Sequence, residues 1–188
     1  MSRLLYIASD YPLPPRPNPH ERMLSVNEAL ALGMSNIPES LLTPGFDRDK
    51  PNVILWMDRE VNFNIDAGTI EDGNFDDDFA LFPAKGYDDV CTEKKYAVGI
   101  EWHAWTQGRA RGVIEYIRDN LAHTDEVEIW YIWMGFGEPP IIHSRTISIA
   151  DLTPQDIKEL EEKETVSTVM AGCEIPVQHR IVITSEHM

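Results

Sequence analysis

The stretch that most constrains the fold is residues 96–134, which has the pattern of a strand, a helix and a second strand. Tyr96–Trp102 is a short apolar run, and Val127–Met134 is rich in the β-branched and aromatic residues that favour strands. Between the two runs, apolar residues recur every three or four positions, as a single helical face requires. These residues are Ala110, Val113, Ile114, Ile117 and Leu121. The pattern predicts a sheet with at least one helix packed on it.

Further strands are predicted where apolar runs are bounded by turn residues. Val61, Phe63 and Ile65 alternate with polar residues, which indicates a strand that is half exposed. The remaining predicted strands are Leu4–Ser9, Val53–Met57, Phe79–Phe82, Ile141–Ile149 and Val177–Thr184.

Two more helices are predicted from their capping residues. Ser25 and Glu28 have the spacing of a capping box, which predicts a helix over Val26–Leu32. Thr153 and Pro154 supply an N-cap and a first-turn proline, which predicts a helix over Pro154–Lys163.

The fold class predicted from these elements is α+β, with about seven strands and about three helices. The strand–helix–strand unit favours a parallel strand pair, whereas the turn-rich segment that begins at Gly135 favours an antiparallel pair. A mixed sheet is therefore expected, with a three-layer α/β arrangement as the alternative. A chain of 188 residues is most simply one domain, so residues 1–188 are predicted to form a single globular domain.

The charge of the chain limits its partners. It carries 32 acidic side chains against 16 basic ones, which gives a formal net charge of −16. Such a surface repels the phosphate backbone of nucleic acids and anionic lipid headgroups, so neither nucleic acid nor membrane is expected as a partner. It favours basic proteins, cationic ligands and metal ions. The sequence leaves the oligomeric state open.

The cytoplasm is the predicted compartment. Cys91 and Cys173 are the two cysteines, and they do not make a disulfide framework. No stretch approaches the ~20 apolar residues that span a bilayer. The apolar run that starts at Leu4 ends at Ser9, too early for the core of a signal peptide.

Sequence motifs point to no cofactor. The chain has no glycine-rich dinucleotide or phosphate loop, and no nucleophile elbow. The acidic loop Glu71–Asp78 places Asp72, Asn74 and Asp76 at the first three ligand positions of a calcium loop. Its sixth position, however, is Asp77 instead of glycine. A divalent-ion site in this loop is therefore left open.

Candidate catalytic residues follow three predicted strands. Asp10, Asp58 and His103 each come directly after or close to the end of a strand, and Arg109 stands in the first turn of the central helix. If the strands are parallel neighbours, these side chains meet at the carboxyl edge of one sheet, where α/β sheets usually bind ligands. A carboxylate, an imidazole and an arginine suit acid–base or metal-assisted hydrolysis.

Two functions are consistent with these observations, and the sequence leaves open whether the protein is an enzyme. The first is an acidic binding protein, of the inhibitor or immunity type, for a basic protein partner. The second is a small hydrolase that uses the Asp/His site at the carboxyl edge of the sheet. The charge and the absent motifs favour the first.

Overall fold

The computed structural model divides the chain into two compact units, and each is described by itself. The first unit comprises residues 1–17 and 74–188, and the second comprises residues 18–73. The prediction of one domain over residues 1–188 stays a prediction. The structure describes residues 3–57, 62–64, 69–71, 76–102, 104–135, 141–164, 166–169 and 173–185.

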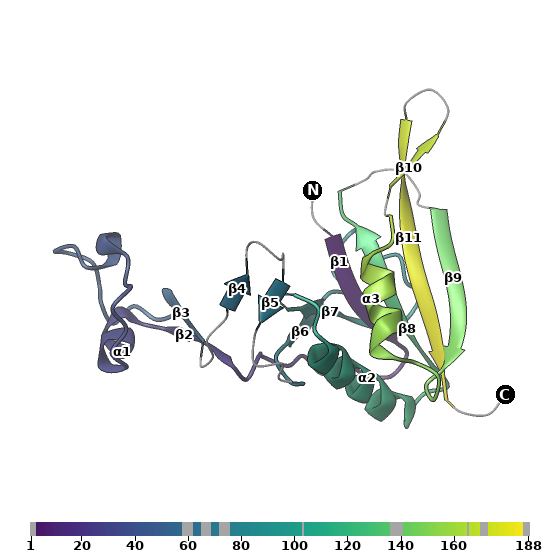
Figure 1. Cartoon of the computed structure of the whole chain (residues 1–188), viewed down its shortest axis with the longest axis horizontal. Helices are drawn as coiled ribbons and strands as arrows, with labels where there is room; N and C mark the ends of the chain where they lie inside the picture. The colour runs from purple at the N-terminus through teal and green to yellow at the C-terminus, as the bar shows by residue number, and fades with distance from the viewer. Residues whose placement is uncertain are drawn as a thin grey trace. The chain divides into compact units, whose positions relative to one another are not determined.

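The first unit is built on a seven-stranded mixed sheet in the order β10-β11-β8-β1-β7-β6, with β9 paired to β11 beside this path (Figure 1). Every described pair in the sheet is antiparallel except β9–β11, which is parallel. The predicted α+β class with a mixed sheet is therefore confirmed. The strands are β1 (Arg3–Ser9), β6 (Ala80–Pro83), β7 (Tyr96–Glu101), β8 (Glu126–Trp133), β9 (Ile141–Ser148), β10 (Val166–Val169) and β11 (Cys173–Thr184).

The central strand–helix–strand unit forms as predicted, but its two strands are not neighbours. Helix α2 (Gln107–Leu121) connects β7 to β8, and β1 lies between these two strands and pairs antiparallel with both. The strands β7 and β8 therefore run in the same direction, as the crossover helix requires. In the same way, β11 lies between β8 and β9, which run in opposite directions.

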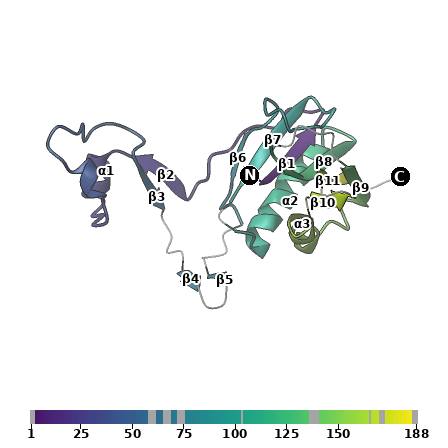
Figure 2. The ribbon, with the colours of Figure 1, turned by 90° about the horizontal axis from the view of Figure 1, so that it is seen from above.

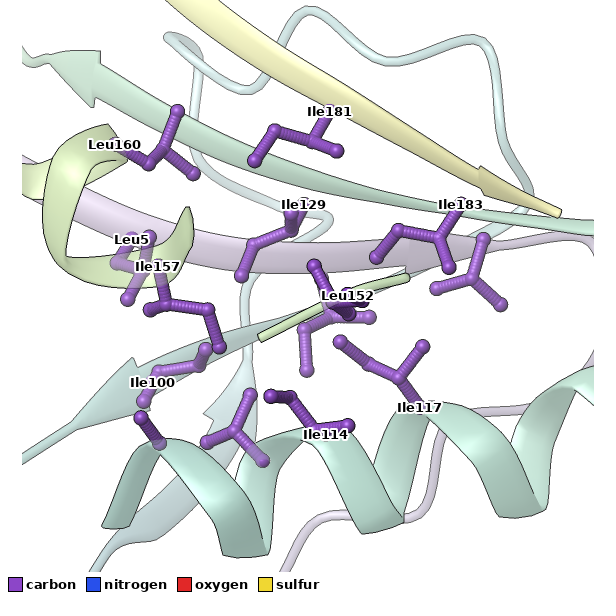
Figure 3. Close-up of a cluster of buried hydrophobic side chains, with 14 of the residues drawn as sticks. Leu5, Ile100, Ile114, Ile117, Ile129, Leu152, Ile157, Leu160, Ile181 and Ile183 are labelled. Carbon is purple, nitrogen blue, oxygen red and sulfur yellow. The ribbon is translucent and has the colours of Figure 1, made fainter. Parts of the chain in front are cut away.

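The main core lies between one face of this sheet and two helices. Figure 2 shows α2 and α3 (Pro154–Glu161) on the same side of the sheet. All five apolar residues of the predicted helical face are buried, and Ile117 has no exposed surface. In Figure 3, Ile114 and Ile117 point from α2 toward the strand residues Ile129 and Ile183. Helix α3 buries Ile157 and Leu160, and it ends at Glu161, two residues before the predicted end.

The opposite face of the sheet carries a smaller apolar cluster that includes Tyr6, Trp130 and Ile132. Ala84 and Val90, from the segment between β6 and β7, pack against this cluster. This face is therefore covered by a connecting segment, whereas the first face is covered by helices.

The second unit has its own small core, which includes Leu24, Val26 and Ile54. Its helix α1 (Val26–Ala31) begins at the predicted capping box, in which Glu28 N–H donates to Ser25 Oγ and Ser25 N–H donates to the Glu28 carboxylate. A short 3₁₀ helix and two antiparallel pairs, β2–β3 and β4–β5, complete its described elements. These are η1 (Glu39–Leu41), β2 (Glu21–Leu24), β3 (Ile54–Met57), β4 (Asn62–Asn64) and β5 (Thr69–Glu71). Of the predicted alternating strand, Val61 and Ile65 lie outside the described residues.

Candidate functional site

The four predicted catalytic residues, three from strand ends and one from the start of the central helix, have different outcomes. Asp58 and His103 lie outside the described residues. Asp10 follows β1 and is exposed, and Arg109 is buried in the first turn of α2. The catalytic roles of the four residues stay predictions.

The parallel arrangement on which that site was predicted is wrong for two of the three strands. Strands β1 and β7 pair antiparallel, with Ser9 opposite Tyr96, so their carboxyl ends lie at opposite edges of the sheet. Asp10 also lines a pocket on the face away from the helices, whereas Arg109 belongs to α2 on the other face. The two described candidates are therefore not brought together.

Arg109 is tied into the fold by the segment that precedes β6. Its Nε donates to the carbonyl oxygen of Asp78 at 2.9 Å and to Asp78 Oδ2 at 3.1 Å, and its Nη2 also bonds that carboxylate. Its Nη1 donates to the carbonyl oxygen of Ala104 at 2.9 Å. The side chains of Arg109 and Asp78 are both 1% exposed. We interpret this arginine as a buried structural tether.

An acidic pocket of about 440 Å³ lies on the sheet face that the helices do not cover. Four carboxylates and two cationic groups line it, along with apolar and thiol side chains. The six charged residues are Asp10, Glu93, Glu126, Glu128, Lys94 and Arg180. They come from β8, β11, the end of β1 and the segment before β7, so the pocket exists only in the assembled sheet.

The floor of the acidic pocket is organised by Glu128, which is 5% exposed. Its Oε2 accepts from Thr92 Oγ1 and from Trp130 Nε1, both at 2.7 Å. Its Oε1 accepts from Arg180 Nη1 at 3.0 Å, and the guanidinium of Arg180 lies 5.0 Å from the centre of the Trp130 ring. These charge-assisted hydrogen bonds satisfy a carboxylate that would otherwise be costly to bury.

The rim of the acidic pocket holds a lysine between two carboxylates. Lys94 Nζ donates to Glu126 Oε1 at 2.6 Å and to Asp10 Oδ2 at 2.9 Å. Partial burial opposes the charge of Lys94, but its bonds to Glu126 and Asp10 outweigh this and raise the pKa of its ammonium. The hydrogen bond from Lys94 lowers the pKa of Asp10. Glu93 is exposed and has no ion-pair partner among the described residues.

A thiol and two buried polar groups lie near the same floor. Cys91 is exposed, lines the pocket and accepts a long hydrogen bond from Gln178 Nε2 at 3.7 Å. Within the described part of the chain, Gln178 Oε1 and the Tyr6 hydroxyl have no hydrogen-bond partner at normal geometry. Burial strongly raises the pKa of Tyr6, although the backbone N–H of Cys91 is near enough to oppose that shift. Tyr6 therefore stays neutral.

The acidic loop offers no metal centre in its described portion. Asp72 and Asn74 lie outside the described residues, and Asp76 forms an ion pair with Arg111 at 3.3 Å. Over the described ranges, no group of three or more His, Cys, Asp or Glu side chains is placed to hold a metal ion.

Comparisons with known proteins find no relative. No family model, no curated protein and no solved structure matches this chain. Among the helices that the structure describes, none combines the length and the apolar character needed to cross a membrane.

Sequence reasoning missed most residues of the acidic pocket. Only Asp10 was predicted as a site residue. Glu128 and Arg180 left one usable signal, because each is a charged residue inside an apolar strand run. Such residues are costly to bury unless they are paired, so they suggest a partner across the sheet.

Proposed function

We propose that the protein is a cytoplasmic binding protein that holds a basic protein partner at its acidic pocket, in the manner of an inhibitor or immunity protein. The observation that carries this proposal is the gathering of four carboxylates around one pocket on the face that the helices leave uncovered. Binding of this kind needs complementary charge and shape but no catalytic group.

The contacts of Lys94 at the rim indicate that the acidic pocket suits a cationic side chain. Lys94 is held at hydrogen-bond distance by Glu126 and Asp10, and its side chain is 13% exposed. A lysine or arginine from a partner would find the same chemistry at Glu93, which has no ion-pair partner among the described residues. Charge-assisted hydrogen bonds of this type are about twice as strong as neutral ones.

The net charge supports the same proposal at longer range. A formal charge of −16 attracts a basic partner before contact and raises the rate of association. This attraction is screened beyond ~8–10 Å at physiological salt, so capture is expected to weaken as ionic strength rises.

The hydrolase alternative gains no support from the described residues. Asp10 is paired with Lys94, and Arg109 is paired with Asp78 on the other face of the sheet, so the two candidates do not form one site.

Affinity capture with charge-matched variants tests the proposal. The pocket variant is Glu93→Gln with Glu126→Gln, and the control is Glu115→Gln with Asp119→Asn, which removes two negative charges from the exposed surface of α2. We expect wild type and control to retain the same basic protein at low salt, and the pocket variant to lose it. Equal capture by the two variants would contradict the proposal, as would the absence of any basic protein at low and high salt.

A further inference from the structure

A second cavity, of about 290 Å³, lies between α3 and the strands β9 and β11. We call it the edge cavity. Arg180 of β11 is one of its lining residues, but the Arg180 guanidinium bonds Glu128 in the acidic pocket. The other charged and ionisable residues that line the edge cavity are His143 and Arg145 from β9, His179 from β11, and Glu159 and Lys163 from the α3 side. One carboxylate thus faces an arginine, a lysine and two imidazoles. This gathering of basic side chains is unexpected in a chain with a net charge of −16.

The cations of the edge cavity are only partly compensated. Arg145 Nη2 pairs with Asp156 Oδ1 at 2.7 Å, whereas Lys163 has no ion-pair partner among the described residues. The rings of His143 and His179 stack with their centres 5.4 Å apart. His179 Nε2 lies 2.7 Å from the carbonyl oxygen of Glu164, which only accepts, so this nitrogen carries the hydrogen.

The edge cavity disfavours a positive charge on His179. Partial burial lowers the pKa of His179, and the neighbouring His143 and Lys163 shift it in the same direction. The hydrogen bond to the Glu164 carbonyl offsets only part of this effect. A bound anion would oppose the shift, because an opposite charge favours the protonated imidazole.

The edge cavity adjoins a free sheet edge. Strand β9 pairs only with β11 among the described strands, and both Figure 1 and Figure 2 show it at the rim of the sheet. Its eight residues contain no proline and no lysine, and Ile141 and Ile142 are 42% and 47% exposed. Natural proteins usually protect long edge strands with proline or lysine, because the unpaired N–H and C=O groups of an edge can pair with another strand.

We propose that an extended acidic segment of a partner protein adds to β9 as a further strand and places a carboxylate in the edge cavity. Strand addition supplies backbone hydrogen bonds, and alternate side chains supply specificity. His143 and Arg145 face the helix side with Ile181, whereas Ile142 and Ser144 face the other side. Every second side chain of the added strand would therefore point toward the edge cavity.

Charge decides between an acidic partner and a second copy of this chain. Antiparallel pairing of β9 with itself would bring His143 and Arg145 of one copy near those of the other, where like charges destabilise cross-strand pairs. Two chains of charge −16 also repel each other. A short acidic segment avoids the cross-strand repulsion, and it is repelled less than a second copy because it carries far fewer negative charges. This interaction is independent of the acidic pocket, whose four carboxylates lie on the opposite face.

Titration with synthetic peptides tests the inference. The probe is a capped eight-residue peptide with glutamate at alternate positions and valine or threonine between them, and its affinity is measured by isothermal titration calorimetry. Two control peptides carry glutamine for every glutamate, or N-methyl groups on alternate amides that prevent strand pairing. We expect the glutamate peptide to bind and both controls to lose binding.

Protein variants complete the test. Lys163→Glu should weaken binding of the glutamate peptide by about tenfold or more, whereas Lys50→Glu, which makes the same charge change on an exposed lysine of the second unit, should not. Both lysines are exposed, so both variants should unfold at the temperature of the wild type. Equal binding of the glutamate and glutamine peptides would overturn the inference. So would binding that survives N-methylation, or binding that is insensitive to Lys163→Glu.

Discussion

Asp78→Ala should destabilise the protein strongly, because it removes the carboxylate that pairs with the buried guanidinium of Arg109. Both side chains are 1% exposed, and their pairing joins the first turn of α2 to the segment that precedes β6. Removing one partner of a buried ion pair typically costs about 3–5 kcal/mol. The prediction therefore tests whether Arg109 is a structural tether or an arginine free to bind an anion.

The structure places the cost at the lower end of that range. Asp78→Ala removes the carboxylate bonds to Nε and Nη2, but the carbonyl oxygens of residue 78 and of Ala104 still accept from Arg109, each at 2.9 Å. These two hydrogen bonds survive, and what is lost is the negative charge of Asp78 with its own bonds to Arg109. We expect a loss of about 3 kcal/mol in the free energy of unfolding.

Urea denaturation followed by tryptophan fluorescence measures this loss. The set comprises Asp78→Ala, Arg109→Met and the double variant, which together give a coupling energy expected at about 2 kcal/mol or more. The control is Asp76→Ala, whose pair with Arg111 is 46% and 48% exposed and should contribute less than about 1 kcal/mol. If Asp78→Ala cost no more than Asp76→Ala, the structural role of Arg109 would be refuted.

Three further predictions concern stability. Ile117→Ala should cost about 2–4 kcal/mol in chemical denaturation, because the side chain is fully buried in the main core; a loss below ~0.5 kcal/mol would mean that the α2 face is misassigned. Gly112→Ala should destabilise by about 1–3 kcal/mol or more, because an added Cβ would lie 1.8 Å from the carbonyl oxygen of Asp76; unchanged stability would contradict this close approach. Burial raises the pKa of Glu161 from 4.5 to about 7, although the hydrogen bond from Trp102 Nε1 opposes the shift. The folded protein holds a proton on Glu161 that the unfolded chain releases. The contribution of this group to the free energy of unfolding is therefore fully present below about pH 4.5 and is lost as pH rises through 7. Glu161→Gln should therefore raise the melting temperature at pH 8 and change it little at pH 4, and an equal effect at both would contradict the assignment.

Local patterns predicted the three α-helices and most of the strands, but they missed β2, β5 and β10 and did not predict which strands are neighbours. The apolar face of α2, the capping box of α1 and the N-cap of α3 depend on residues a few positions apart, so the sequence shows them directly. Strand order depends on contacts between distant segments. Strand β1 enters between β7 and β8, and β11 enters between β8 and β9. No local signal specifies either insertion.

The acidic pocket was unpredictable for the same reason. Its charged residues lie far apart in the sequence, from Asp10 to Arg180. They meet only because β8 pairs with both β1 and β11. The basic partner proposed for the acidic pocket was already expected from the net charge, because net charge depends on composition alone. The edge cavity runs against that composition, because it gathers cationic groups on an acidic chain.

The most direct test of the proposed binding function is NMR mapping with a basic probe. A capped eight-residue peptide of alternating arginine and serine is titrated into the labelled protein at low salt, and amide shifts are followed. We predict that the largest shifts fall on residues 91–94 and 126–130, around the acidic pocket, and that they vanish in Glu93→Gln with Glu126→Gln. Shifts concentrated on the exposed surface of α2, around Glu115 and Asp119, or unchanged in that variant, would contradict the account.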